Sequence, residues 1–269
     1  MKTHIFRLGS VGAHMVGGPE AGAIDLIYSS LLQEFGQDIY SHIHVNQIGQ
    51  DLDELVMKEG KKIHINIRYP AYEDFEVKSV EEKNRIRLEV AHAGLLRIAE
   101  YDKKLDINKL EIIRKKILGN NFLFDFVYKT YVNKKNPNLS GKVIVQPLMD
   151  KFVFYALIEE DNKVKCKQIF FRGIPGYYYM DKYFCYGKWD KENELIIWGK
   201  EKIVETHVNI ESCSVNIVNL TPYPTPPYYT LMRVDISDEE REKSRKDWEH
   251  SQPPAITALV RQSLGGAAN

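Results

Sequence analysis

Long apolar runs are missing from this sequence. No stretch approaches the roughly 18 consecutive apolar residues that a membrane-spanning helix needs. The first segment, Met1 to Leu8, is too short and too often interrupted by polar side chains to be the apolar core of a secretion signal. The sequence therefore predicts neither a membrane span nor a signal peptide, and we expect a cytoplasmic protein.

Cysteine is also scarce. The chain has three, Cys166, Cys185 and Cys213, which is an odd number at wide spacing with no Cys-x-x-Cys pair. Such an arrangement indicates neither a disulfide framework nor a zinc-binding pattern. Because all three lie in segments that we predict to be strands, we interpret them as buried thiols in a reducing compartment.

Charge of one sign is not in excess. Lys+Arg and Asp+Glu both number 37, so the formal net charge is +0. This balance argues against nucleic acid or an anionic membrane as a partner bound by overall attraction, and leaves only a local patch open. With 43% hydrophobic residues the chain is not wholly disordered, and 269 residues suffice for one large domain or two modest ones.

Residues 1–119 carry strong helical signals. Apolar residues at spacings of three and four from Ile24 to Phe35 predict a helix that ends at Gly36. Capping signals at Ser79 and Asp106 open two consecutive helices with a short connection. Two helices joined in this way predict an antiparallel helical hairpin.

Strands are predicted in the same region. Alternation over Asp38 to Gln47 and over Lys61 to Tyr69 predicts two strands of one sheet. Between them, Asp51 to Glu59 resembles a short helix with a capping box at its start. We therefore expect residues 1–119 to form a mixed α/β region.

From Asn120 onward the apolar pattern changes to a period of two. Aromatic and β-branched residues alternate from Phe122 to Val132, as is typical of a long strand. Six further strands are predicted over Lys142 to Gln146, Lys151 to Ile158, Val164 to Phe171, Gly176 to Tyr186, Leu195 to Trp198 and Ile203 to Val218. Tight connections predict an antiparallel meander, so we expect residues 120–233 to be β-rich and to form one globular body with residues 1–119.

The last segment, residues 234–269, differs in composition from the rest. A capping box at Ser237 opens a polar helix that runs to Trp248, and Pro253-Pro254 separates this helix from a short apolar stripe. We predict a docking tail that binds its own body, another protein or a second copy of the chain. The predicted partner-binding residues are Trp248, Ile256, Leu259, Val260 and Leu264.

Together these elements predict an α+β fold. We expect a helix-containing N-terminal half with a helical hairpin, then a largely antiparallel meander sheet, then a C-terminal helical tail.

Histidine supplies the few candidate catalytic residues. His42 and His44 share one face of a predicted strand, and His64 lies on a strand that we expect in the same sheet. Three neighbouring histidines can hold zinc, yet each also suits the polar face of a half-exposed strand. The register is unknown, so we treat the three as weak candidates for a hydrolase-like site and predict no metal and no cofactor.

Two other patterns resemble binding sites without completing one. The glycine-rich loop Gly9 to Gly18 precedes a helix, as phosphate-binding loops do, but it matches neither a P-loop nor Gly-x-Gly-x-x-Gly. Glu89 and His92 stand three residues apart on one helix, as in di-metal bundles. The facing helix offers Glu111 and no histidine, so we interpret His92 as a histidine at the edge of the core.

Basic residues gather between Lys103 and Lys142. The candidate basic surface consists of Lys103, Lys104, Arg114, Lys115, Lys116, Lys134 and Lys135. With tyrosines interleaved, such a surface suits nucleic acid or an acidic protein, although charged helix faces are usually only solvated.

These observations rank three functions. The first is a soluble, non-enzymatic protein-binding protein, such as a bacterial immunity protein that neutralises an effector, or an assembly component. The second is an enzyme with a site assembled in space around the histidines. The third is a nucleic-acid-binding module that uses the Lys103 to Lys142 surface.

Overall fold

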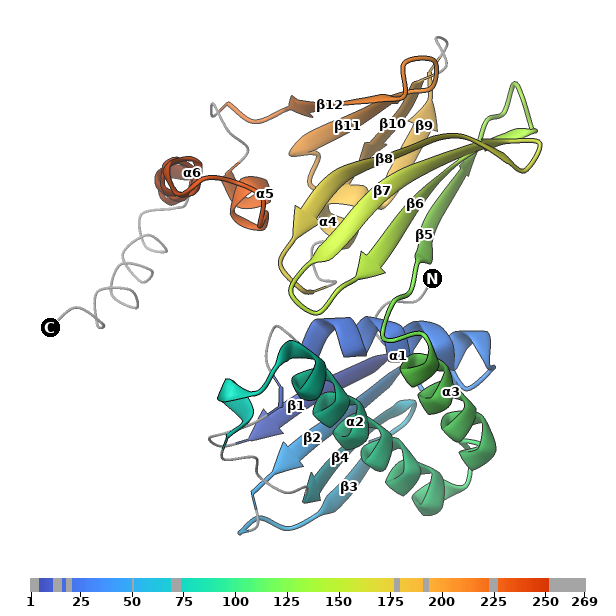
Figure 1. The fold of residues 1–269 in the computed structure, drawn as a ribbon, viewed down its shortest axis with the longest axis vertical. Helices are drawn as coiled ribbons and strands as arrows, with labels where there is room; N and C mark the ends of the chain where they lie inside the picture. The colour runs from blue at the N-terminus through green and yellow to red at the C-terminus, as the bar shows by residue number, and fades with distance from the viewer. Residues whose placement is uncertain are drawn as a thin grey trace, which may run out of the picture. The chain divides into compact units, whose positions relative to one another are not determined.

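The computed structural model describes residues 5–11, 16–17, 21–49, 51–68, 74–176, 180–190, 194–222 and 227–251. Over these ranges the fold is α+β, with three four-stranded sheets and six α-helices (Figure 1). The chain divides into two compact units. The first comprises Met1–Thr130, Lys142–Tyr155 and Ile174–Tyr178, and the second Tyr131–Gly141, Ala156–Gly173 and Tyr179–Asn269.

The first unit contains a mixed sheet in the order β1-β2-β4-β3. Its strands are β1 (Phe6–Val11), β2 (His42–Ile48), β3 (Leu55–Glu59) and β4 (Lys62–Arg68). β1, β2 and β4 run parallel, and β3 pairs with β4 in the antiparallel sense. The predicted strands at Asp38 to Gln47 and Lys61 to Tyr69 are thus confirmed as neighbours in one sheet. Alternation buries Ile43, Val45, Ile63 and Ile65 on one face.

The helix predicted over Asp51 to Glu59 is wrong, because the segment ends in strand β3. Two of its carboxylates, Asp53 and Glu54, bind Arg68 of β4 and do not cap a helix. Glu54 accepts the backbone N–H of Arg68 at 2.9 Å, and Asp53 lies 2.9 Å from the Arg68 guanidinium. The edge of β4 gives Leu55–Glu59 a ladder of backbone partners, so tertiary pairing overrides a local capping pattern.

Helix α1 (Gly22–Glu34) covers the free edge of β1. The backbone N–H of Phe6 donates to Ser29 Oγ at 3.0 Å, and that of Leu8 donates to Asp25 Oδ1 at 2.7 Å. Two polar side chains one helical turn apart therefore satisfy strand donors that would otherwise face apolar surroundings.

Helices α2 (Val80–Asp102) and α3 (Ile107–Gly119) follow a short 3-10 helix at Phe75–Val77. The predicted capping box of Ser79 with Glu82 is confirmed, and Asp106 accepts the N–H groups of Asn108 and Lys109. α2 packs on β2 and β4 (Figure 1). It approaches closely at Gly94, where a Cβ atom would lie 2.4 Å from Val45 Cγ1.

The description of the first half as helix-containing with a helical hairpin is not borne out as stated. The first described element is a strand, and helices are sparse among the first elements. The two consecutive helices α2 and α3 come only after four strands. Strong capping signals made the helices conspicuous in the sequence, whereas short strands leave weaker patterns.

Two further sheets replace the single meander that the sequence predicts. The order β5-β6-β7-β8 joins Phe126–Val132, Leu139–Pro147, Phe152–Glu160 and Lys163–Gly173. The order β12-β11-β10-β9 joins Ser214–Asn219, Val204–Asn209, Glu194–Trp198 and Tyr186–Trp189, all antiparallel. In each sheet, neighbours in space are neighbours in sequence, as the short connections predict.

Two of the predicted strands need correction. Gly176 to Tyr186 does not form one strand, because helix α4 (Met180–Phe184) precedes β9. Ile203 to Val218 is two strands, β11 and β12, which reverse at a turn ending in Cys213 with φ 49°. Asn209 and Ser214 pair with each other across this turn. Alternation of apolar residues alone does not reveal such a reversal of the chain.

Helix α5 (Pro227–Leu231) contributes to an aromatic cluster of the second unit. The ring of Tyr229 lies 4.9 Å from that of Phe171 and 5.2 Å from that of Tyr183, measured between centroids. Phe184 lies 5.2 Å from Phe171. These rings hold α4 and α5 against β8.

Helix α6 (Asp238–Ser251) begins the predicted tail and packs on α5 (Figure 1). Glu240 N–H donates to Ser237 Oγ at 3.1 Å, so the predicted cap is present. Arg241 donates to the backbone oxygen of Arg233, and Ser244 is fully buried. The helix is therefore docked on its own chain. Trp248 is half-buried, and the apolar stripe of Ile256, Leu259, Val260 and Leu264 lies outside the described residues.

The interpretation of all three cysteines as free thiols is wrong. Cys166 of β8 and Cys213 form a disulfide, with their Cα atoms 5.4 Å apart across a sequence separation of 47, and Cys185 is a free buried thiol. Wide spacing in sequence concealed this pair, because only the folded sheets bring the two residues together. The cross-link removes the ground on which the sequence favoured a reducing compartment.

Among the helices that the structure describes, none combines the length and the apolar character needed to cross a membrane.

Candidate functional site

His44 and His64 lie side by side in the first sheet. They are register partners on the parallel strands β2 and β4, and their ring centroids are 5.4 Å apart with an interplanar angle of 62°. His42 lies in the adjacent row, is exposed, and has its Nδ1 atom 3.2 Å from Ser41 Oγ. The structure therefore brings together two of the three histidines that the sequence singles out.

These histidines belong to a surface that we call the polar face, which is the side of the first sheet opposite Ile43, Val45, Ile63 and Ile65. Its side chains form rows across the strands because each strand alternates. One row contains Arg7, His44, His64 and Met57. The next contains Gly9, Asn46, Asn66 and Leu55.

The second row is held by a side-chain amide pair. Asn46 Nδ2 donates to Asn66 Oδ1 at 3.1 Å. At Gly9, a Cβ atom would lie 2.4 Å from Asn46 Oδ1 and 2.7 Å from His44 Nε2. Glycine at this position therefore allows the histidine and the amide to lean over β1 together.

The polar face is accessible and has more positive than negative side chains. Arg7, His42 and Lys62 are exposed, whereas Glu59, next to Lys62, is the one carboxylate in the rows around the histidines. Leu55 and Met57 are 50% and 46% exposed, so apolar surface borders the polar rows. His44 is only half-exposed, and partial burial, then the neighbouring His64 and Arg7, hold its pKa below the usual value.

A short repeat marks this site in the sequence, and it is a signal that motif and spacing patterns alone do not single out. The segments 43–46 and 63–66 read Ile-His-Val-Asn and Ile-His-Ile-Asn. The pattern occurs again as His207-Val208-Asn209 on β11. There the ring is flanked by carboxylates, with Glu194 at 2.8 Å and Glu205 at 3.2 Å. The tripeptide alone therefore does not specify the environment of its histidine.

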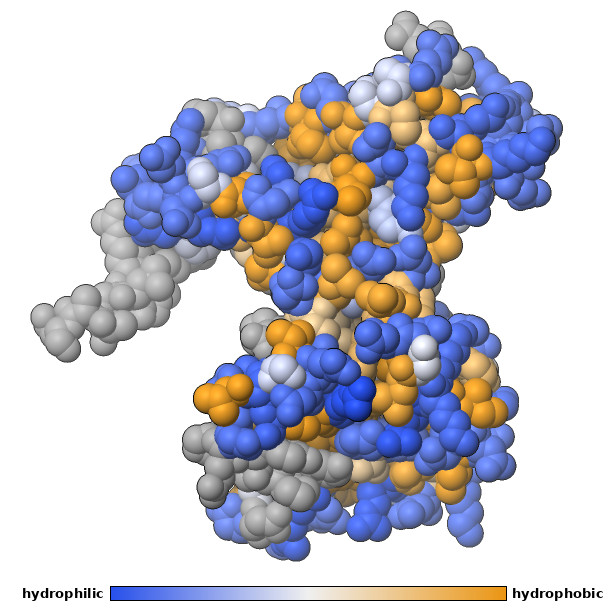
Figure 2. Space-filling view, in the orientation of Figure 1, coloured by the Kyte–Doolittle hydropathy of each residue, from blue (hydrophilic) through white to orange (hydrophobic). Residues whose placement is uncertain are grey.

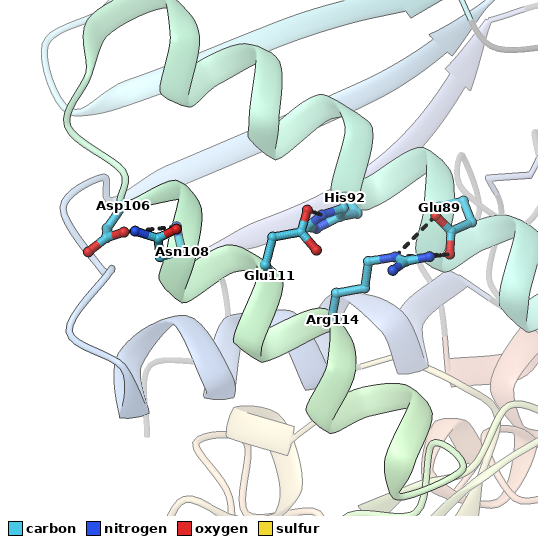
Figure 3. A network of polar contacts seen from close by, with 6 residues as sticks. All are labelled: Glu89, His92, Asp106, Asn108, Glu111 and Arg114. Carbon is cyan, nitrogen blue, oxygen red and sulfur yellow. Dashed lines mark hydrogen bonds and ion pairs between the residues drawn. The ribbon is translucent and has the colours of Figure 1, made fainter.

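A second polar network joins α2 to α3 (Figure 3). Arg114 makes a bidentate pair with Glu89, with its closest contact at 2.7 Å, and His92 Nε2 lies 3.0 Å from Glu111. The pKa of Arg114 is raised by Glu89, and that of Glu111 is lowered by its hydrogen bond with His92. Glu89 and His92 are thus engaged by different residues of α3. His92 is 4% exposed, in agreement with a histidine at the edge of the core.

The seven residues of the predicted basic surface belong to both units. Lys103, Lys104, Arg114, Lys115 and Lys116 lie on or beside α2 and α3, whereas Lys134 and Lys135 lie between β5 and β6. Arg114 is paired with Glu89, and Lys116 lies 2.5 Å from Glu34. At least two of the seven are therefore neutralised within the chain.

The helical side of the first unit offers only separated apolar spots. In Figure 2 the surface over α2 and α3 is mostly hydrophilic. Its most exposed apolar side chains are Val77 at 84% and Val80 at 61%. Isolated apolar residues of this kind are common on protein surfaces and do not by themselves indicate a docking site.

The glycine-rich loop is described only in part, since residues 12–15 and 18 lie outside the described ranges. Within it, the backbone of Val16 is held on both sides. Its N–H donates to Gln47 at 3.2 Å, and its oxygen accepts from Arg87 Nε at 3.0 Å. Among the described residues, no group of three or more His, Cys, Asp or Glu side chains is arranged to hold a metal ion.

Comparison with known protein families, with curated proteins and with solved structures finds no match to this chain.

Proposed function

We propose that the polar face binds a phosphate-bearing anion. The observation that carries the proposal is the row in which Arg7, His44 and His64 stand side by side on three adjacent strands. A guanidinium and two imidazoles are the groups that proteins commonly direct at phosphate oxygens. The row contains no carboxylate that would repel an anion.

The neighbouring row adds hydrogen-bonding groups of the right kind. Asn46 and Asn66 keep amide donors and acceptors beyond the one bond between them. Bringing a negative charge to the histidines favours their protonated form, so binding and proton uptake are linked. We therefore expect tighter binding at pH 6 than at pH 8.

The test uses tripolyphosphate as the probe and the full chain. Imidazole signals of His44 and His64 are followed by NMR at both pH values, and affinity is measured by calorimetry. We expect both signals to shift on titration, and the variant Arg7→Ala to bind more weakly. His207→Ala is the matched control, since its ring already lies between two carboxylates. Shifts confined to residues outside the two rows would contradict the proposal.

The protein-binding function predicted from the tail stays a prediction. Helix α6 is docked on α5, so a partner would meet the segment that follows it and the half-buried Trp248. Deleting Ser251 to Asn269 should then weaken a complex or self-association, as measured by pull-down and by light scattering. An unchanged partner profile and oligomeric state would remove this alternative, along with its immunity or assembly role.

A further inference from the structure

The pairing of two imidazoles on the polar face has a chemical consequence beyond binding. A phosphodiester that reacts by displacement needs a proton acceptor at the attacking oxygen and a proton donor at the leaving oxygen. Histidine serves both purposes near neutral pH, and two neighbouring histidines supply both at once. With ring centroids 5.4 Å apart and rings inclined at 62°, His44 and His64 can address two oxygens of one phosphate group.

We propose that the polar face cleaves single-stranded RNA by internal transesterification, with His44 as the base and His64 as the acid. This inference rests on the proposed function, because the phosphate must first bind beside Arg7.

Each step balances. Neutral His44 takes the proton of a ribose 2′-hydroxyl, and the 2′-oxygen forms a bond to the adjacent phosphorus. The bond from phosphorus to the 5′-oxygen breaks, and protonated His64 gives its proton to that oxygen. The products are a 2′,3′-cyclic phosphate and a 5′-hydroxyl. His44 then loses a proton to water and His64 gains one, and no atom changes its oxidation state.

Several features of the face favour RNA over other phosphate esters. The nucleophile belongs to the substrate, so the two histidines need to move only protons. Asn46 and Asn66 offer amide groups that can hydrogen-bond to a base edge or a ribose hydroxyl. Leu55 and Met57, at the ends of the two rows, present exposed apolar surface beside which an unstacked base can lie. A single strand is required because the bases of a duplex are not free to lie on a sheet.

The assignment of base and acid follows from the neighbours of each ring. His44 is flanked by Arg7 on β1 and by His64 on β4, and partial burial together with these neighbours lowers its pKa, which favours the neutral form that can accept a proton. Arg7 is placed to offset the negative charge of the phosphate. His42, Lys62 and Glu59 form the adjacent row. Arg68 lies on the same face two rows away and is paired with Asp53, and Arg7 also interacts electrostatically with the buried carboxyl of Asp25. One neutral and one protonated histidine predict a bell-shaped dependence of rate on pH.

The experiment uses the full chain with EDTA and an oligodeoxynucleotide that contains a single internal uridine ribonucleotide, labelled at both ends. We expect cleavage only after the ribonucleotide, with a cyclic phosphate on one product. His44→Gln and His64→Gln should each lower the rate at least about a hundredfold. His207→Gln is the control variant and should keep the full rate. Circular dichroism of each variant verifies folding.

The outcomes separate this inference from the proposed function. Binding of the oligonucleotide at the polar face without cleavage would overturn the cleavage inference and leave anion binding intact. Absence of both binding and cleavage would overturn the proposed function and the cleavage inference. Cleavage that persists in the variant carrying both His44→Gln and His64→Gln, or that occurs equally in an all-deoxyribose strand, would also overturn the inference. In each single variant the bell-shaped pH profile should change to one in which the rate falls on only one side. This result would support the assigned roles.

Discussion

His44 and His64 of the sheet β1-β2-β4-β3 and His207 of the sheet β12-β11-β10-β9 all belong to the pattern His-x-Asn. The surroundings of the rings differ between the two sheets. His44 and His64 are half-exposed and stand in a row with Arg7 and no carboxylate. His207 lies between Glu194 and Glu205, which take up both of its ring nitrogens. A strand with the pattern His-x-Asn places both polar side chains on one face, whatever the sequence around it. The cross-strand neighbours then decide whether that face attracts an anion or repels it.

The two units should also differ in what unfolds them, and the largest effect concerns the disulfide. Replacing Cys166 and Cys213 by alanine should lower the free energy of unfolding of the second unit by about 3 kcal/mol, because the cross-link closes a long loop. All three tryptophans lie in this unit, so their fluorescence in urea reports it alone. The imidazole signals of His44 and His64 should not change. Loss of those signals together with the fluorescence would mean that the two units unfold as one.

In the first unit, Asp25 is the group that we expect to make stability depend on pH. Burial raises its pKa to about 8, against a hydrogen bond from Leu8 that lowers it. The folded state therefore holds a proton that the unfolded state releases near pH 4, so stability falls as pH rises from about 4 to 8. Asp25→Asn keeps an acceptor for the Leu8 N–H and should remove this pH-dependent loss of unfolding free energy. We expect the loss to be on the order of 2 kcal/mol after local relaxation. Urea unfolding at pH 5 and pH 8, followed by NMR, measures it. An equal slope in the variant would assign the pH dependence to another group.

Reversing one charge should make the first histidine site resemble the second. Arg7→Glu places a carboxylate beside His44, and we expect affinity for tripolyphosphate to fall on the order of tenfold. The pKa of His44 should rise, since a positive neighbour is replaced by a negative one. Arg85→Glu is the charge-matched control, because Arg85 is an exposed residue of α2 paired only with Glu81 among the contacts described. Equal losses of tripolyphosphate affinity in both variants would show that the effect comes from the overall charge of the protein.

The smallest expected effect comes from one methyl group. Gly9→Ala would place a Cβ atom within 2.7 Å of both Asn46 Oδ1 and His44 Nε2, so both side chains must move. We expect a few-fold loss of anion affinity with little change in unfolding, because the displaced groups are polar and near the surface. Gly119→Ala is the control, since an added Cβ there meets no atom within 4 Å. Unchanged affinity in Gly9→Ala would show that the close approach at β1 does not shape the site.

Local signals in the sequence identified some elements well and others poorly. The capping groups at Ser79 and Asp106 act within one helical turn, and both helices begin where these residues predict. The helix predicted over Asp51 to Glu59 was wrong because Glu54, one carboxylate of the predicted capping box, accepts the backbone N–H of Arg68, which is distant in sequence. The sequence predicted the two strands that carry the histidine pair, but it did not predict that the two rings are neighbours. His44 and His64 were both assigned to one sheet, but the register that makes them neighbours depends on how β2 and β4 align.

The sequence by itself determined the α+β class, the caps of α2 and α3, and the alternation that puts histidine and asparagine on the polar side of β2 and β4. These features depend on contacts within a few residues, whose energies are set by the local chain. Only the tertiary structure decided that β3 is a strand, that Cys166 meets Cys213, and that Arg7, His44 and His64 form one row. Each of these depends on which distant segments pair. That choice is made by burial of the whole core, and no short stretch of sequence contains it.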